Sequence, residues 1–228
     1  MIPSARAGLP FLVLIILLNP SARIRGQGEE VLPADDFLRW SASHCEAVGK
    51  AMYVKGRVGG LFGYRGLKTE RAGNYKLAAT WLTPDVIRAT ARLIQLRSRL
   101  SDEEARALVR EANLPLSAVI LIELDPREGS GVIPHDWEAF LGPKLRGGIR
   151  PPVRGTNTPE LREIRALSSV LRRNYDYDRF WLVFPLQRDD GASLFAPTDT
   201  EAELLVRIEN QEGRVCWPIP QSARKTFK

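Results

Sequence analysis

The stretch 202–219, AELLVRIENQEGRVCWPI, decides the fold class of this sequence. Apolar and polar residues alternate along Ala202–Glu209, which is the pattern of a strand with one buried face. Asn210-Gln211-Glu212-Gly213 is predicted to form a four-residue turn, with the glycine in the left-handed region. The chain then returns along Arg214–Ile219, so the stretch predicts an antiparallel hairpin at the C-terminal end.

The predicted turn also sets which residues of the hairpin face each other. A four-residue turn pairs Ile208 with Cys216 on the core face, and Arg207 with Trp217 on the mixed face. Arg207 and Trp217 would then make a cation–π contact, either as a binding platform for a sugar or peptide or as ordinary cross-strand packing. Packing is the favoured reading for a single aromatic side chain. Pro218 lacks the amide hydrogen that a ladder needs, so the return strand is predicted to lie at a sheet edge.

Three stretches carry signals for the start of a helix. Thr83-Pro84-Asp85 combines an N-cap, a proline at the first helical position and an acid in the first turn. Ser101-Asp102-Glu103-Glu104 is a capping box, so the two stretches predict a helical hairpin. Thr158-Pro159-Glu160 repeats the first signal and predicts a third helix that runs to about Arg173. A short helix is also expected at His135–Leu141.

The apolar run Ala118–Ile122 is short and leads into Glu123 and Asp125, which is typical of a central strand buried on both faces. Strands at both ends and helices between them predict an α+β fold. Its sheet is expected to be mainly antiparallel and to contain both the 118–124 strand and the C-terminal hairpin. The three main helices are expected to pack mostly on one face of that sheet.

The N-terminal residues 1–28 have the pattern of a secretory signal peptide. Arg6 precedes the apolar run Leu9–Leu18, which is shorter than the ~20 residues of a spanning helix. Cleavage is expected after Gly28, with Ala22 as a second candidate site, which predicts a secreted or periplasmic protein. An uncleaved leader that anchors the chain in a membrane is the alternative. We therefore expect a single α+β domain over 29–220, with a basic Gly/Pro loop at 142–157 and a disordered tail at 221–228.

The charge of the chain is mildly basic once the leader is set aside. The whole sequence has a formal net charge of +6, and the leader contributes three arginines and no acid. Export would place the two cysteines, Cys45 and Cys216, in an oxidising compartment, where they either form a disulfide or stay as two separate thiols. Two cysteines are too few for a disulfide scaffold, so the apolar core is expected to provide most of the stability.

The sequence contains few residues that favour catalysis. With only two histidines, His44 and His135, a multi-histidine metal site is excluded, and no metal or other cofactor is predicted. Glu123 and Asp125 end a central strand, and together with His135 they are the weak catalytic candidates for an envelope hydrolase. Neither a nucleophile elbow nor a phosphate-binding loop is present.

Basic residues gather in one segment, Lys144–Arg173, and aromatic residues follow it. In an exported protein this segment favours an acidic envelope polymer or another envelope protein as the partner, and in a cytosolic one it favours nucleic acid. A solvated loop and helix face is the simpler interpretation. The weak binding candidates are Arg172, Arg173, Tyr175, Tyr177, Arg207 and Trp217.

Three hypotheses for the function follow, in order of preference. The first is a non-enzymatic exported protein that binds a partner or has a structural role in the cell envelope. The second is an envelope hydrolase that uses Glu123 and Asp125 with His135. The third is nucleic-acid binding through 144–173, which requires that the N-terminal stretch is not a signal peptide.

Overall fold

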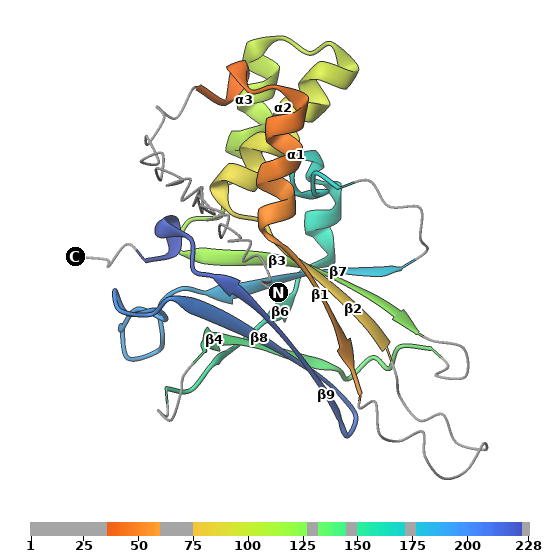
Figure 1. The fold of residues 1–228 in the computed structure, drawn as a ribbon, viewed down its shortest axis with the longest axis vertical. Coiled ribbons are helices and arrows are strands. Elements are labelled where there is room, and N and C mark those ends of the chain that lie inside the picture. The colour runs from red at the N-terminus through yellow and green to blue at the C-terminus, as the bar shows by residue number, and fades with distance from the viewer. Residues whose placement is uncertain (1–35, 60–74, 127–131, 145–149, 172–176, 225–228) are drawn as a thin grey trace, which may run out of the picture. The chain divides into compact units, whose positions relative to one another are not determined.

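The computed structural model describes residues 36–59, 75–126, 132–144, 150–171 and 177–224. They belong to one compact unit, Ala34–Lys228. The predicted leader, 1–28, lies outside the described residues. Figure 1 shows two β-sheets with the α-helices gathered beyond one of them. The predicted α+β class, with antiparallel sheets and a C-terminal hairpin, is confirmed.

All strand pairings in the two sheets are antiparallel. The five-stranded sheet has the order β1 (Tyr53–Val58), β2 (Tyr75–Trp81), β3 (Ser117–Pro126), β7 (Asp178–Pro185), β6 (Thr156–Asn157). The four-stranded sheet has the order β5 (Val153–Arg154), β4 (Glu138–Pro143), β8 (Glu201–Ile208), β9 (Gln211–Pro218). The apolar strand β3 is the middle strand of its sheet, as predicted.

The α-helices are α1 (Ala42–Ala51), α2 (Pro84–Ser98) and α3 (Asp102–Glu111). Short 3-10 turns accompany them: η1 (Asp36–Arg39), η3 (Pro159–Glu163), η4 (Arg165–Leu167) and η5 (Gln221–Ala223). Thr83 caps α2 by accepting a hydrogen bond from the amide of Val86 at 3.3 Å. Ser101 and Glu104 form the predicted capping box of α3, each accepting from the other's backbone amide. Both helix starts are therefore confirmed.

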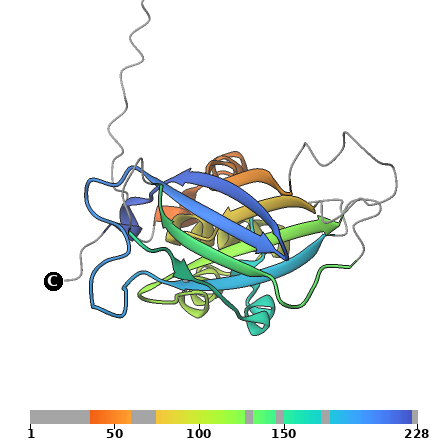
Figure 2. The same cartoon turned by 90° about the horizontal axis from the view of Figure 1, so that it is seen from below.

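The five-stranded sheet separates two apolar cores, because its side chains alternate between faces. One face packs against the four-stranded sheet through residues such as Leu77, Ile122 and Phe184. The other packs against the helices through Leu121 and Trp181. The layers are thus helices, five-stranded sheet and four-stranded sheet, and Figure 2 shows the two sheets stacked.

The hairpin is present, but the predicted register is wrong. Ile208 pairs with Gln211, so the turn has two residues, and Glu209 takes a φ of 51° there. Trp217 therefore faces Ala202 and is 1% exposed, while Cys216 points outward and is half-buried. The observed register buries the large indole instead of a thiol, which removes more apolar surface from water.

Gly213 is consequently a strand residue and not part of the turn. A Cβ at Gly213 would lie 2.4 Å from the carbonyl oxygen of Arg57 in β1. At the same place the amide of Gly59 donates to the carbonyl oxygen of Glu212 at 3.2 Å. We call this contact between β1 and β9, at residues 57–59 and 212–213, the seam. Glycine is required at the seam because two backbones approach each other closely.

The predicted sharing of one sheet by the 118–124 strand and the hairpin is also wrong, because β3 and β8–β9 lie in different sheets. One of the connections between the sheets is the segment that holds β5 and β6, which pair with β4 and β7 respectively. Gly155 lies between these two strands, and a Cβ there would lie 2.6 Å from the ring of Phe184. This part of the predicted loop 142–157 is therefore strand and not linker.

Over 158–171, the part of it that the structure describes, the helix predicted over 158–173 is not formed. Its residues make the two 3-10 turns η3 and η4, and Ile164 between them has an extended backbone. Trp181 donates its indole N–H to the carbonyl of Leu167 at 2.9 Å, which takes the place of a helical hydrogen bond. Besides α2 and α3, the remaining α-helix of the described residues is α1. The helix expected at His135–Leu141 is wrong, because β4 lies there.

Cys45 and Cys216 are both free thiols. Cys45 is fully buried in the core between the helices and the five-stranded sheet, whereas Cys216 lies on the outward face of the four-stranded sheet. Burial raises the pKa of Cys45 to about 11, and burial also raises the pKa of Cys216. The disulfide that the sequence allows is not formed in this structure.

We expect alkylation to distinguish the two thiols. In the native chain at neutral pH, one alkyl group should add slowly at Cys216 and none at Cys45, because the buried thiol is protonated and shielded. In denaturant, both should react. Intact-mass measurement and peptide mapping would locate the groups. A chain that takes up no reagent in denaturant until a reductant is added would contradict the free thiols.

Candidate binding site on the five-stranded sheet

The helix-facing side of the five-stranded sheet changes from apolar to charged along its length. Leu121 on β3 and Trp181 on β7 lie under the helices, and the next residues on the same face carry charge because side chains alternate. Figure 1 shows the strand ends extending beyond the helices on that side. We call this charged surface the strand-end face, and it comprises Lys55, Arg57, Lys76, Glu123, Asp125 and Arg179.

The register places these side chains in two rows across adjacent strands. Lys55, Ala78, Glu123 and Arg179 pair in sequence across β1, β2, β3 and β7. Arg57, Lys76 and Asp125 form the next row. The carboxylates therefore lie in the middle of the surface on β3, and cations lie on both sides of them.

The two carboxylates are held by cations on neighbouring strands. Glu123 is 2% exposed and lies 3.5 Å from Nε of Arg179. Lys76 donates to Asp125 at 2.7 Å in a more exposed pair. A buried carboxylate is costly unless it is paired, so the Arg179 guanidinium helps to stabilise Glu123 in this position.

The cations on β1 are different, because the described residues provide no acidic partner for them. Lys55 is exposed and lies over the ring of Tyr53, with its ammonium 5.7 Å from the ring centroid. Arg57 is half-buried and makes no ion pair within the described ranges. The strand-end face therefore has a positive excess on its β1 side.

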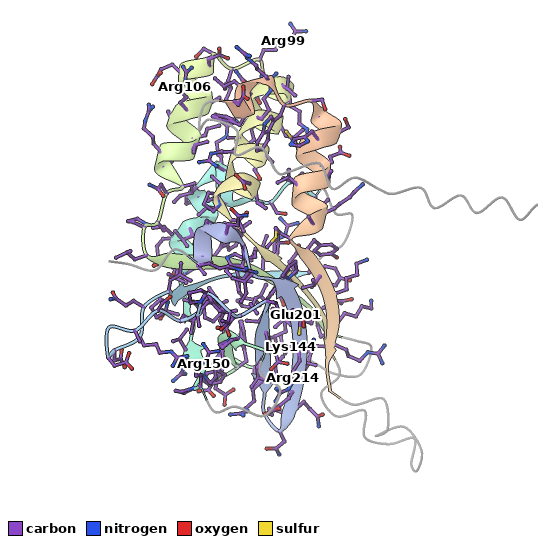
Figure 3. All side chains as sticks on the ribbon, turned by 60° about the vertical axis from the view of Figure 1, so that its left-hand side comes forward. Arg99, Arg106, Lys144, Arg150, Glu201 and Arg214 are labelled. Carbon is purple, nitrogen blue, oxygen red and sulfur yellow. The ribbon has the colours of Figure 1, made fainter. Side chains whose placement is uncertain are left out.

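The outward face of the four-stranded sheet shows the opposite arrangement. Two of its arginines each have an acidic partner. Arg214 forms ion pairs with Glu203 and Glu212, and Arg207 forms an ion pair with Glu212. Figure 3 shows Lys144, Glu201 and Arg214 together on this sheet, far from Arg99 and Arg106 at the helical end. This surface is neutralised by its own residues.

The weak catalytic candidates are not brought into one contact group. Glu123 and Asp125 lie side by side on the strand-end face, each beside a cation. His135 is exposed in the turn before β4, which belongs to the other sheet. Within the described ranges, no hydrogen bond or ion pair joins His135 to either carboxylate.

The binding candidates of the hairpin lie on opposite faces of their sheet, so the predicted Arg207–Trp217 pair is absent. Arg207 lies instead over the ring of Phe140, 5.8 Å from its centroid. Trp217 packs against Trp81 inside the core and donates to the carbonyl of Met52. Tyr177 is half-buried just before β7, next to the strand-end face in sequence. Arg172, Arg173 and Tyr175 lie outside the described residues.

Three cations of the segment 144–173 are paired with acids of the same chain. Lys144 pairs with Glu201, and Arg154 pairs with Glu138. Arg150 donates through both terminal nitrogens to Asp199, which is only 8% exposed. These pairs fasten the segment to the four-stranded sheet and its loops.

The pair between Arg150 and Asp199 predicts an acid-sensitive contribution to stability. Burial acts to raise the pKa of Asp199, but hydrogen bonds from Arg150 and the Ala196 amide outweigh it and lower that pKa below 3.8. The stabilisation is therefore complete above the unfolded-state pKa and is lost as the pH falls through the folded one. Urea unfolding should show Asp199→Asn less stable than the native chain at pH 7, with the difference shrinking below about pH 4. A difference that is constant from pH 7 to pH 3 would contradict this.

Further features bear on the class of site. In the described part of the chain, no three His, Cys, Asp or Glu side chains gather as a metal-binding group. Among the same residues, no helix has the length and apolar character needed to cross a membrane.

The sequence analysis identifies Glu123 and Asp125 as candidates but misses their cationic neighbours, because only strand pairing brings these residues together. The missed residues are Lys55, Arg57, Lys76 and Arg179.

Comparisons with protein-family models, with curated proteins and with solved structures each found no match for this chain.

Proposed function

We propose that this chain is an exported, non-enzymatic binding protein of the cell envelope, which holds an envelope component at the strand-end face. The observation that carries the proposal is the positive excess on β1, where Lys55 and Arg57 have no acidic partner among the described residues. They lie on the same face of the sheet as the pair of Glu123 with Arg179, with β2 between them and Glu123. Rigid elements with unneutralised charge are suited to recognition of a charged ligand.

The export part of the proposal comes from the sequence of residues 1–28. A basic residue, an apolar run of signal-peptide length and small residues at the expected cleavage point support it. The preference for binding over hydrolysis has a separate basis. Each carboxylate on β3 already lies beside a cation, and the exposed His135 belongs to the turn before a strand of the other sheet.

Nucleic-acid binding through 144–173 receives less support from the described contacts. Lys144, Arg150 and Arg154 are each paired with an acid of the same chain. A phosphate backbone would have to displace those acids before it could use these three cations.

Cell fractionation of the chain expressed with its own leader tests the proposal. We expect intact mass to show a chain shortened near Gly28, found outside the cytoplasm and retained by washed envelopes at low salt. A full-length chain in the cytosol would overturn the proposal. In a parallel incubation, the purified chain should release no soluble fragments from the envelopes. Release that disappears in His135→Ala would establish the hydrolase instead.

A further inference from the structure

The cations of the strand-end face are spread too widely for a single small anion. Lys55 and Arg57 lie on β1 and Arg179 lies on β7, with β2 and β3 between them. Neighbouring strands are about 4.8 Å apart, so the two sides of the surface are separated by about 14 Å. One carboxylate or phosphate group reaches one side only. A ligand that uses both sides must carry anionic groups at more than one place.

The middle of the surface sets a second condition on the ligand. Asp125 is paired with Lys76, and Glu123 is buried beside Arg179, so the centre has little unbalanced charge. Arg179 lies 3.5 Å from Glu123 through Nε, its side chain is 42% exposed, and its guanidinium also carries two terminal nitrogens. Those nitrogens form a planar fork that suits a carboxylate or phosphate. The ligand therefore crosses a neutral centre between two cationic sides.

We infer that the ligand is a linear polyanion with a non-aromatic chain, such as a carboxylated or phosphorylated polysaccharide. Its anionic groups bind Lys55 and Arg57 at one side and Arg179 at the other. This inference rests on the proposed function, because it names the envelope component held by the same face. Glu123 acts as a positioning residue, which holds the guanidinium of Arg179 in place.

The aromatic side chains near this face favour a polysaccharide over single-stranded nucleic acid. Sites for single strands combine cations with aromatic rings on which bases stack. Here the ring of Tyr53 already receives the ammonium of Lys55, and Tyr177 is half-buried and engaged within the chain. A base would have to displace these contacts in order to stack.

Equilibrium binding of the leader-free chain to polygalacturonate, polyphosphate, uncharged dextran and oligo(dT) tests the inference. We expect binding to one or both of the first two, weakening as salt is raised, and none to dextran. Stronger binding to polygalacturonate would assign a carboxylated ligand, and stronger binding to polyphosphate a phosphorylated one. The triple variant Lys55→Gln/Arg57→Gln/Arg179→Gln should bind the preferred probe roughly tenfold more weakly.

A matched variant with the same loss of charge provides the control. Lys50, Arg97 and Arg162 are exposed on other elements, and Lys50→Gln/Arg97→Gln/Arg162→Gln should change binding less than about twofold. The double variant Lys55→Gln/Arg57→Gln leaves the pair of Glu123 with Arg179 intact. It should also bind the preferred probe more weakly, so it tests the inference even if loss of Arg179 unfolds the chain. Equal loss in both triple variants, no loss in the double variant, or tighter binding of oligo(dT) would overturn the inference.

The outcomes for the function and for the ligand are separable. An exported chain that is retained by envelopes but ignores both polyanions keeps the proposed function and loses this inference. A cytosolic chain that binds a polyanion through Lys55 and Arg57 keeps this inference and loses the proposed function.

Discussion

Replacing Trp217 with alanine should reduce the free energy of unfolding by about 4 kcal/mol, which is typical for removal of a large buried aromatic side chain. The indole is 1% exposed, and its ring centroid lies 5.9 Å from that of Trp81. Its N–H also donates to the carbonyl of Met52 at 2.9 Å, so the substitution leaves a cavity and an unsatisfied acceptor. Equilibrium unfolding in urea, monitored by circular dichroism, would measure the loss.

The same experiment distinguishes the observed register of the hairpin from the one that the sequence predicts. In the predicted register, Trp217 lies on the mixed face of the hairpin opposite Arg207, and removal of an exposed cation–π pair there would cost about 0.5–1 kcal/mol. Arg207→Ala is the matched control. That side chain is exposed and paired with Glu212, so we expect a change below about 1 kcal/mol. Similar small effects of the two substitutions would show that Trp217 is not in the core.

The second large effect is expected from Gly213→Ala at the seam. The new methyl group would lie 2.4 Å from the Arg57 carbonyl oxygen and 2.8 Å from a methyl carbon of Val58. Backbone atoms of a paired strand cannot move aside cheaply, so we expect a loss of about 3 kcal/mol. For a chain of this size, that loss lowers Tm by roughly 6–12 °C, which calorimetry would detect.

Gly191→Ala separates steric overlap from the general cost of replacing a glycine. Gly191 has a φ of 81° in an exposed turn, and its nearest neighbour would be 3.9 Å from the added carbon. The cost there is conformational and should be about 1 kcal/mol. If Gly213→Ala costs no more than Gly191→Ala, the two strands do not approach as closely at the seam as described.

The elements that local sequence determines were predicted well. The starts of α2 and α3 depend on side chains within four residues of each other, such as Thr83 with the Val86 amide and Ser101 with Glu104. The central position of β3 follows from its continuous apolar run, which needs cover on both faces. These features require no knowledge of the rest of the chain.

The features that were predicted wrongly depend on distant partners. The turn residues of the hairpin favour the longer turn, but the core, which accepts Val215, Trp217 and Ile219 together, selects the two-residue turn with Glu209 at positive φ. Similarly, the 158–173 stretch has a helical pattern of apolar residues. In the structure, Trp181 donates a hydrogen bond to the carbonyl of Leu167, and the backbone of Ile164 is extended. Tertiary contacts override propensity in both cases.

The candidate site could be predicted only in part for the same reason. Glu123 and Asp125 are visible as acids at the end of an apolar strand, and they were singled out as catalytic candidates. Their cationic neighbours on β1, β2 and β7 are separated from them by 47 positions or more along the sequence (Lys76 to Glu123). The spacing of residues within one strand cannot reveal such neighbours, because they come together only when the strands pair.

The seam also affects how the chain behaves beside other copies of itself. A sheet edge with unpaired backbone groups is a template for another strand and a common origin of aggregation. Here β1 and β9, the long outer strands of the two sheets, lie against each other, and the remaining outer strands, β5 and β6, have two residues each. The seam therefore covers part of the edge that β1 and β9 would otherwise present, which should disfavour edge-to-edge pairing of another copy at these two strands.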